Sequence, residues 1–163
     1  MRHGDVDHAS CTIDCIKGHE YRLDEFLFGF KTEKQTKDKE KRVTMIERIL
    51  DSAEKRGNKV KYCVIYLAPQ NYHRYHAPTF FTANYRRHIA GWLELVRPSY
   101  LDKHKDVLTE NERVSLLGEW SHGFFAMSFI GAMGVGSIKL NFDDVLTTNV
   151  RSPVEPYISD KNY

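Results

Sequence analysis

The feature that most constrains the fold is a series of short apolar runs in the second half of the chain. Three such runs occupy residues 112–117, 124–130 and 135–142, and glycines lie in the gaps between them. Runs of this length, bounded by glycine, are typical of β-strands. Their short spacing favours an antiparallel meander, in which consecutive strands are neighbours in the sheet. We therefore expect these residues to form adjacent antiparallel strands, the first of them broken at Gly118.

Shorter elements are expected on either side of this series. The clearest is a strand over 60–67, which is rich in β-branched and aromatic residues. Apolar patterning also predicts a strand at 11–16, a helix at 22–29, an extended segment at 79–88 and a strand at 93–96. After Asp144 the apolar pattern thins, so we expect residues 145–163 to form a tail or an interrupted loop.

One longer, amphipathic helix is expected over residues 42–56, and Gly57 supplies its stop. Its apolar positions recur at helical spacing, at Val43, Ile46, Leu50 and Ala53. Such a helix can lie on a membrane surface, but the acidic residues on its polar face favour an ordinary helix with one buried stripe. Residues 31–41 carry almost no apolar side chain, and we expect a charged loop or a frayed helix there. The chain, 1–163, is then expected to be a mainly β, α+β domain with its antiparallel strands in a meander or barrel-like sheet.

Composition narrows the kind of molecule. With 41% hydrophobic and 28% charged residues, the chain has the balance of a globular protein. A net charge of +2 gives no basis for nucleic-acid binding. The 3 cysteines show no Cys-x-x-Cys spacing, which argues against a disulfide framework or a zinc site, and we predict no bound metal. No apolar stretch is long enough to span a bilayer, and the polar N-terminus shows no targeting segment.

The clearest candidate site is a segment bracketed by proline in the middle of the chain. Pro69 and Pro78 enclose two histidines, His73 and His76, on a stretch that proline would stiffen. Imidazole can take up and release protons near neutral pH, so this pair is a candidate for acid–base catalysis. Two alternatives stay open: surface histidines without a role, and a small metal-binding module that adds His88. No carboxylate or cysteine lies among these three histidines, which weighs against the metal.

The same segment carries a family resemblance. Tyr72-His73-Arg74-Tyr75-His76-Ala77-Pro78 resembles the Tyr-His-x-x-His-x-Pro motif of phosphatidylserine decarboxylases. Further blocks resemble the same family in the same order: Arg86-Arg87-His88 before Gly91, Asn111 to Val114, Gly118 to Phe125, and Gly131 to Ile138. The chain thus resembles the mitochondrial type of this family over most of its length.

The resemblance implies an enzyme of phospholipid biosynthesis, a carboxy-lyase that converts phosphatidylserine to phosphatidylethanolamine and CO2. Removing the carboxylate leaves an electron pair on carbon, and the family supplies the electron sink as a pyruvoyl group made from one of its own serines. By position, His76 matches the base of the self-cleavage that makes this group, and His73 matches the histidine implicated in the proton transfers of decarboxylation. Arg86 and Arg87 are candidates to bind the phosphodiester headgroup, with two solvated arginines as the alternative.

Two parts of the family's machinery are missing from the sequence. Neither the Asp motif expected before His3 nor the Leu-Gly-Ser motif that provides the pyruvoyl serine occurs within residues 1–163. We therefore expect an incomplete domain, the middle of the larger beta subunit, that is inactive alone. The resemblance further implies a small pyruvoyl-bearing alpha subunit as partner and peripheral attachment to the mitochondrial inner membrane. The alternative is a non-catalytic, degenerate relative that binds lipid or a protein partner.

Overall fold

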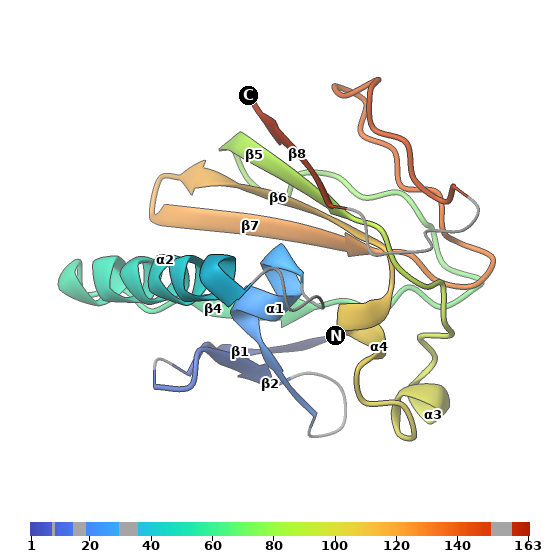
Figure 1. The fold of residues 1–163 in the computed structure, drawn as a ribbon, viewed down its shortest axis with the longest axis horizontal. Helices are drawn as coiled ribbons and strands as arrows, with labels where there is room; N and C mark the ends of the chain where they lie inside the picture. Colours follow the sequence, from blue (N-terminus) through green and yellow to red (C-terminus); the bar gives the residue numbers. More distant parts are fainter. Residues whose placement is uncertain (8, 15–18, 30–35, 151–157) are drawn as a thin grey trace.

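A four-stranded antiparallel sheet forms the centre of the fold (Figure 1). The structure, a computed structural model, describes residues 1–7, 9–14, 19–29, 36–150 and 158–163. The strand order is β7-β6-β5-β8, with β5 at Phe81–Ile89, β6 at Arg113–Trp120, β7 at Gly123–Ile130 and β8 at Ile158–Asn162. The expected α+β class with mainly antiparallel strands is confirmed, and the sheet is open rather than closed into a barrel.

Strands β5, β6 and β7 form the meander that the sequence predicted. β6 and β7 are joined by a two-residue turn and pair along their whole length, from Arg113 opposite Ile130 to Trp120 opposite Gly123. Gly123 has φ +108°, a conformation that glycine adopts without strain. The runs at 112–117 and 124–130 are therefore confirmed as strands.

The expected break at Gly118 is wrong, since β6 continues to Trp120. A β-bulge between Ala83 and Tyr85 of β5 disturbs the register beside this position. A Cβ atom at residue 118 would lie 1.8 Å from the Thr82 carbonyl oxygen. Glycine is required here because two backbones approach closely, and it does not interrupt the strand.

Helices α1 (Leu23–Phe28) and α2 (Thr36–Lys55) and two small sheets lie on one side of the central sheet (Figure 1). Helix α1 ends at Gly29 with φ +74°, as expected. Each small sheet is an antiparallel pair: β1 (Arg2–Asp5) with β4 (Lys61–Val64), and β2 (Thr12–Asp14) with β3 (Glu20–Arg22). Buried side chains from these elements pack with Leu117 of β6 into the main core. The expected strand at 11–16 is present as β2, and residues 15–16 lie outside the described residues.

Helix α2 spans Thr36–Lys55 and begins earlier than the expected start at residue 42. It starts inside the segment 31–41, for which we expected a charged loop or a frayed helix, and residues 31–35 lie outside the described residues. Lysine and glutamate are strong helix formers, so a helix can continue through a stretch with few apolar residues. Ile46 and Leu50 are buried, as their spacing predicted. Within the described residues, no helix combines the length and the apolar composition needed to cross a membrane.

Strand pairing corrects several of the expected elements. The strand predicted over 60–67 is shorter in the structure: β4 spans Lys61–Val64, and Val64 lies opposite Arg2 of β1. Residues 93–96 do not form a strand, and Trp92 makes only an isolated bridge to Asn111. Two short helices, α3 (Pro98–Leu101) and α4 (Val107–Glu110), lie between β5 and β6.

Residues 135–142 are not a strand either, although their alternation is real. Gly136, Ile138 and Leu140 are buried, and the residues between them are exposed. Ile138 and Leu140 pack against Val114 and Leu116 on the second face of the sheet, where they form a smaller core. Within the described chain the segment is not part of any sheet. The alternation of buried and exposed residues therefore indicates that one face of the segment is buried, and it does not indicate hydrogen bonding to a neighbouring strand.

A buried arginine ties the ends of α1 and α4 together. Arg113 is 1% exposed and donates hydrogen bonds of 2.6–3.0 Å to four backbone carbonyl oxygens. The acceptors belong to Glu25, Phe26, Thr109 and Asn111. Burial lowers the pKa of Arg113 to about 10. Carbonyl groups near a helix C-terminus are short of intrahelical donors. This one cation supplies donors at two helix ends, although the Glu25 carbonyl also accepts the Gly29 N–H.

The C-terminal residues correct, at Ile158–Asn162, the expectation of a tail or an interrupted loop over 145–163. β8 pairs antiparallel with β5, from Ile158 opposite Ile89 to Asn162 opposite Tyr85. Residues 151–157 lie outside the described residues. The sheet therefore gains an edge strand that the thin apolar pattern did not predict.

Candidate functional site

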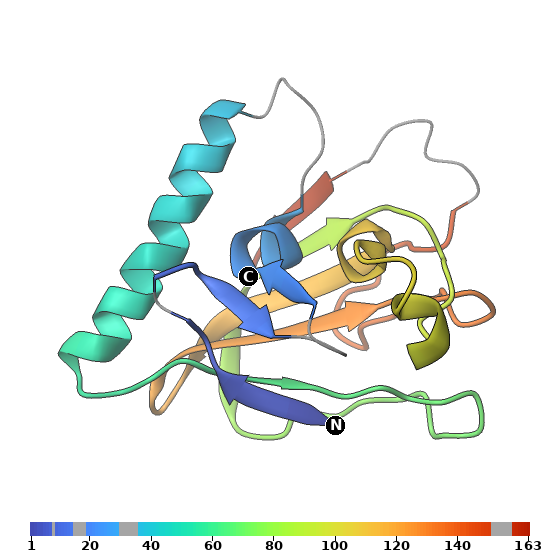
Figure 2. The ribbon, with the colours of Figure 1, turned by 90° about the horizontal axis from the view of Figure 1, so that it is seen from below.

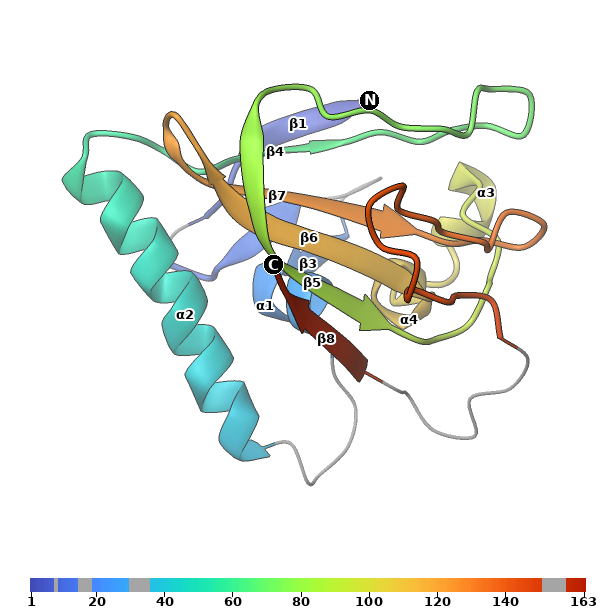
Figure 3. The same cartoon turned by 90° about the horizontal axis from the view of Figure 1, so that it is seen from above.

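The two candidate histidines lie on an exposed loop, residues 65–80, between β4 and β5. The loop reaches the end of the molecule away from α2 (Figure 2, Figure 3). A tight turn joins Ala68 and Asn71: the Asn71 N–H donates to the Ala68 carbonyl and the Ala68 N–H donates to Asn71 Oδ1, both at 2.8 Å. These two bonds fix the backbone just before His73.

His73 is oriented by the backbone of this turn. Its Nδ1 lies 2.6 Å from the Asn71 carbonyl oxygen. A carbonyl oxygen only accepts hydrogen bonds, so Nδ1 carries the proton and the lone pair of the neutral ring sits on Nε2. Nε2 of His73 has no hydrogen-bond partner among the described residues. The ring is therefore held at one nitrogen and open at the other.

His76 is oriented by a side chain four residues earlier. Tyr72 Oη lies 3.0 Å from His76 Nε2. The two rings are nearly parallel, with an interplanar angle of 8° and centroids 5.9 Å apart. In the described part of the chain, Nδ1 of His76 meets no hydrogen-bond partner. The two imidazoles are thus held through different nitrogens.

Tyr75, between the two histidines, anchors the loop to the sheet. Its ring stacks on Phe129 of β7 with the centroids 3.5 Å apart, and its hydroxyl donates to the Lys139 carbonyl at 3.4 Å. Burial raises the pKa of Tyr75 to about 12, so this hydroxyl stays protonated at neutral pH. Aromatic packing therefore positions the loop in addition to the two prolines.

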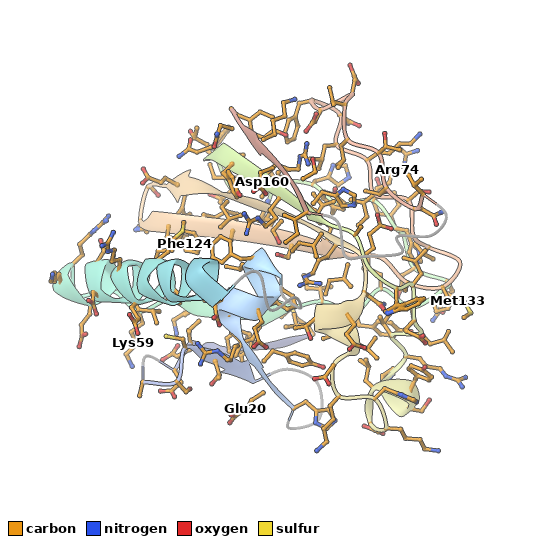
Figure 4. All side chains as sticks on the ribbon, viewed as in Figure 1. Glu20, Lys59, Arg74, Phe124, Met133 and Asp160 are labelled. Carbon is orange, nitrogen blue, oxygen red and sulfur yellow. The ribbon has the colours of Figure 1, made fainter. Side chains whose placement is uncertain are left out.

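Both histidines remain accessible on this surface. Figure 4 shows Arg74, which lies between them in the sequence, on the side of the molecule that also carries Met133 and opposite Lys59. Among the described residues, no ion pair joins a carboxylate to His73 or His76, and no three His, Cys, Asp or Glu side chains form a group that could hold a metal ion. The site offers two oriented imidazoles for proton transfer.

Arg86 and Arg87, the predicted headgroup-binding residues, are engaged in ion pairs on β5. Arg86 is buried, and it donates from Nε to Asp143 at 3.1 Å and from Nη1 to the Ser159 carbonyl at 3.0 Å. Arg87 donates to both carboxylate oxygens of Asp160, at 2.7 and 2.6 Å. These contacts tie β8 to β5 and favour structural roles. Binding of a headgroup by either arginine stays a prediction.

Asp143 is the buried acceptor at the centre of this network. Besides Arg86, it accepts hydrogen bonds from Lys161 Nζ at 2.8 Å and Tyr163 Oη at 2.7 Å. Burial alone would raise the pKa of Asp143, but these hydrogen bonds and the charge of Arg86 lower it to about 2. The carboxylate is therefore charged at neutral pH and holds the end of β8 against the loop that contains Asp143.

Two further histidines have structural contacts. His88 Nε2 lies 2.8 Å from Glu112 Oε1, and both residues are buried. Glu112 also accepts a hydrogen bond of 2.9 Å from the Asn149 N–H, which fixes the segment around Asn149. The ring of His122, in the β6–β7 turn, packs edge-on against the Trp120 ring, with the ring centroids 4.7 Å apart. His88 is thus bonded to Glu112 and not to the two loop histidines.

Sequence reasoning missed the partners that orient the two candidate histidines. Tyr72 and Tyr75 lie within the family motif, but only the histidines of that motif were given roles. The available signal for Tyr72 was its hydroxyl, four residues before His76 in a loop. The contact of Tyr75 with Phe129 joins residues far apart in the sequence, so no local pattern could have shown it.

The structure thus places two oriented imidazoles on a loop that packs against an open antiparallel sheet. The family model described as phosphatidylserine decarboxylase matches residues 1–158. The chain belongs to the phosphatidylserine decarboxylase family, as the resemblance predicted.

Curated relatives carry the same family name. The chain is 39% identical over 140 residues to the mitochondrial phosphatidylserine decarboxylase proenzyme of Cricetulus griseus, covering 86% of this chain and 34% of that protein. It is 48% identical over 93 residues to the proenzyme of Rattus norvegicus, covering 57% of this chain and 23% of the relative. It is 43% identical over 107 residues to the mitochondrial phosphatidylserine decarboxylase proenzyme 1 of Saccharomyces cerevisiae, covering 64% of this chain and 21% of the relative. The chain thus spans about a third or less of the length of these relatives.

Proposed function

We propose that this chain is the histidine-bearing part of a phosphatidylserine decarboxylase, a carboxy-lyase that makes phosphatidylethanolamine and CO2. The observation that carries the proposal is the pair of oriented imidazoles, His73 and His76, within the loop that bears the family motif. The relatives are named mitochondrial, so we place the whole protein in the mitochondrion, at the inner membrane.

The proposed chemistry needs an electron sink and groups that move protons. In this family a pyruvoyl group supplies the sink for the electron pair left when CO2 departs. Residues 1–163 contain no Leu-Gly-Ser sequence, so a companion alpha subunit carries that group in the proposed enzyme. His76 takes the proton of the serine hydroxyl during self-cleavage, and His73 exchanges a proton with substrate through its open Nε2. The fixed, accessible imidazoles fit these two tasks.

One unpaired edge supports binding of the companion subunit. β7 is an edge strand of the described sheet, hydrogen-bonded there to β6 alone. Free N–H and C=O groups along such an edge can pair with an added strand. The alpha subunit therefore completes the sheet in this proposal.

Peripheral attachment to a membrane is supported by the surface around the histidine loop. Ile65 and Tyr72 are 64% and 61% exposed on the loop itself, and Met133 is 62% exposed. Arg74 adds a positive charge to the same loop. Exposed apolar side chains with neighbouring basic residues suit the interface of an anionic bilayer. Such contact would bring the imidazoles close to phosphatidylserine.

The test is release of CO2 from phosphatidylserine labelled in its serine carboxyl group. Protein isolated from its own cells, together with any companion peptide, should release labelled CO2. Replacing His76 by Ala should lower the rate by about 10²–10⁴-fold, whereas His122→Ala, in the β6–β7 turn, should leave it unchanged. The 163-residue chain purified alone should release none. Native protein that shows neither labelled CO2 nor a pyruvoyl-blocked companion in mass spectrometry would refute the proposal in favour of a non-catalytic relative that binds lipid or a protein.

A further inference from the structure

We propose that Tyr72 is a positioning residue for His76, and that its hydroxyl determines which ring nitrogen of His76 carries the proton. The contact is geometric: Tyr72 Oη is 3.0 Å from His76 Nε2, and the rings are inclined by only 8°. Among the described residues the Tyr72 hydroxyl has no other hydrogen-bond partner. The hydroxyl is therefore free to serve this one imidazole.

The direction of the hydrogen bond follows from the chemistry of the two groups. A neutral imidazole has one nitrogen that donates and one that accepts. A phenol ionises near pH 10, far more readily than a neutral imidazole loses its N–H proton, so the phenol is the better donor. Tyr72 then donates to Nε2, and the proton of the neutral His76 ring sits on Nδ1. When the ring is protonated, Nε2–H donates to Oη instead, so the contact survives a full proton cycle.

The consequence is a specific arrangement of donor and acceptor around His76. Nδ1–H has no partner in the described chain and can donate to a carboxylate, while Nε2 already holds a hydroxyl. Carboxylate, imidazole and hydroxyl in this order are the elements of a nucleophilic triad. Tyr72 occupies the place of the attacking hydroxyl, so it holds His76 in the required tautomer until a serine hydroxyl replaces it at Nε2.

His73 shows why this assistance is specific to His76. The tautomer of His73 is set by a backbone carbonyl, 2.6 Å from Nδ1, which no side-chain substitution removes. The tautomer of His76 depends on one side-chain hydroxyl. A change at Tyr72 should therefore affect His76 and leave His73 as it is.

The tautomers can be measured directly on the 163-residue chain with ¹⁵N-labelled histidine. Two-bond ¹H–¹⁵N correlation spectra at pH 8 distinguish protonated from unprotonated ring nitrogens, and His76→Ala assigns the signals. In the unchanged chain we expect His76 to show Nδ1 protonated and Nε2 unprotonated. Tyr72→Phe, which removes only the hydroxyl, should convert His76 to a mixture that contains the Nε2–H form. Tyr75→Phe is the matched control, because it removes a hydroxyl from the same loop and keeps the ring on Phe129.

The outcomes are decisive in either direction. Loss of the single tautomer in Tyr72→Phe but not in Tyr75→Phe supports the proposal. A His76 spectrum that is the same in Tyr72→Phe and in the unchanged chain overturns it, and so does an equal change in both variants, because that result would report a loosened loop.

The role of the contact in self-cleavage rests on the proposed function. In the native protein, Tyr72→Phe should slow self-cleavage about two- to tenfold, because part of His76 then carries its proton on Nε2, the nitrogen that must accept one. The remaining uncleaved proenzyme can be followed by mass. The NMR result stands whether or not the native protein releases CO2, so failure of the proposed function and failure of this inference are separate results.

Discussion

Gly118→Ala should open the pairing between β5 and β6. The added Cβ would lie 1.8 Å from the Thr82 carbonyl oxygen and 2.8 Å from its carbonyl carbon. Both are backbone atoms, so no side-chain rotation can relieve the contact. Carbon and oxygen approach to about 3.3 Å even in close C–H···O contacts. The two strands must therefore separate by roughly 1.5 Å at this point.

The cost follows from what the separation breaks. Loss of about two ladder hydrogen bonds near Gly118 costs about 1–3 kcal/mol. Partial exposure of Leu117, which is 3% exposed in the main core, adds about 1 kcal/mol. A total of about 3 kcal/mol raises the population of the locally open state by about 10²-fold.

Amide hydrogen exchange read by mass spectrometry measures this local opening. Peptides that cover β5 and β6 should exchange about 10²-fold faster in Gly118→Ala. Gly57→Ala is the matched control: its φ is +71° but no atom lies within 4 Å of the added Cβ. Its cost of about 1–2 kcal/mol should stay at the end of α2. Unchanged exchange in β5 and β6 of Gly118→Ala would refute the claim that these backbones touch.

Three further changes test other parts of the fold. The pKa of Asp143 is lowered to about 2 from 3.8. Its stabilisation of β8 is therefore complete above about pH 4 and is lost as the pH falls through about 2. Amide exchange of β8, measured as a function of pH, should show this loss in that window. Arg113→Met removes a buried guanidinium that donates to four backbone carbonyls and should destabilise the chain to urea by about 3–5 kcal/mol. The exposed Arg48→Met should change this stability by less than about 0.5 kcal/mol. Tyr75→Ala removes the contact with β7 and should speed exchange in residues 65–80 by about tenfold, while Tyr75→Phe should not; equal rates in the two variants would contradict the role of the aromatic stack.

Local patterns predicted those elements whose cause is local. The strand at 124–130 has apolar residues between two glycines, and the helix that ends at Gly29 has its stop in the sequence. Gly118 shows the limit of prediction from local patterns. In a sequence, a glycine that ends a strand looks the same as a glycine that lets a neighbouring backbone approach closely. The alternation at 135–142 likewise indicates one buried face, but it cannot say whether a strand lies alongside.

The sequence pattern did not predict β8, because this strand has little apolar periodicity and is held in place by long-range charge contacts. Asp160 meets Arg87, and Lys161 meets Asp143, across long sequence separations. The candidate site divides in the same way. The motif identified His73 and His76, whereas the turn at Asn71 and the hydroxyl of Tyr72 orient them through contacts in the folded structure.

The pairing of β8 with β5 also implies an order of events while the protein is made. β6 and β7 are joined by two residues, and a hairpin of this kind closes in about 1–10 μs. Arg87 and Asp160 are 73 residues apart, so β8 leaves the ribosome seconds after β5 at ordinary rates of synthesis. During that interval a three-stranded sheet exists with the edge of β5 exposed and the charge of Arg87 not yet matched by Asp160. This intermediate is the species that a chaperone, or a second nascent chain, would meet first.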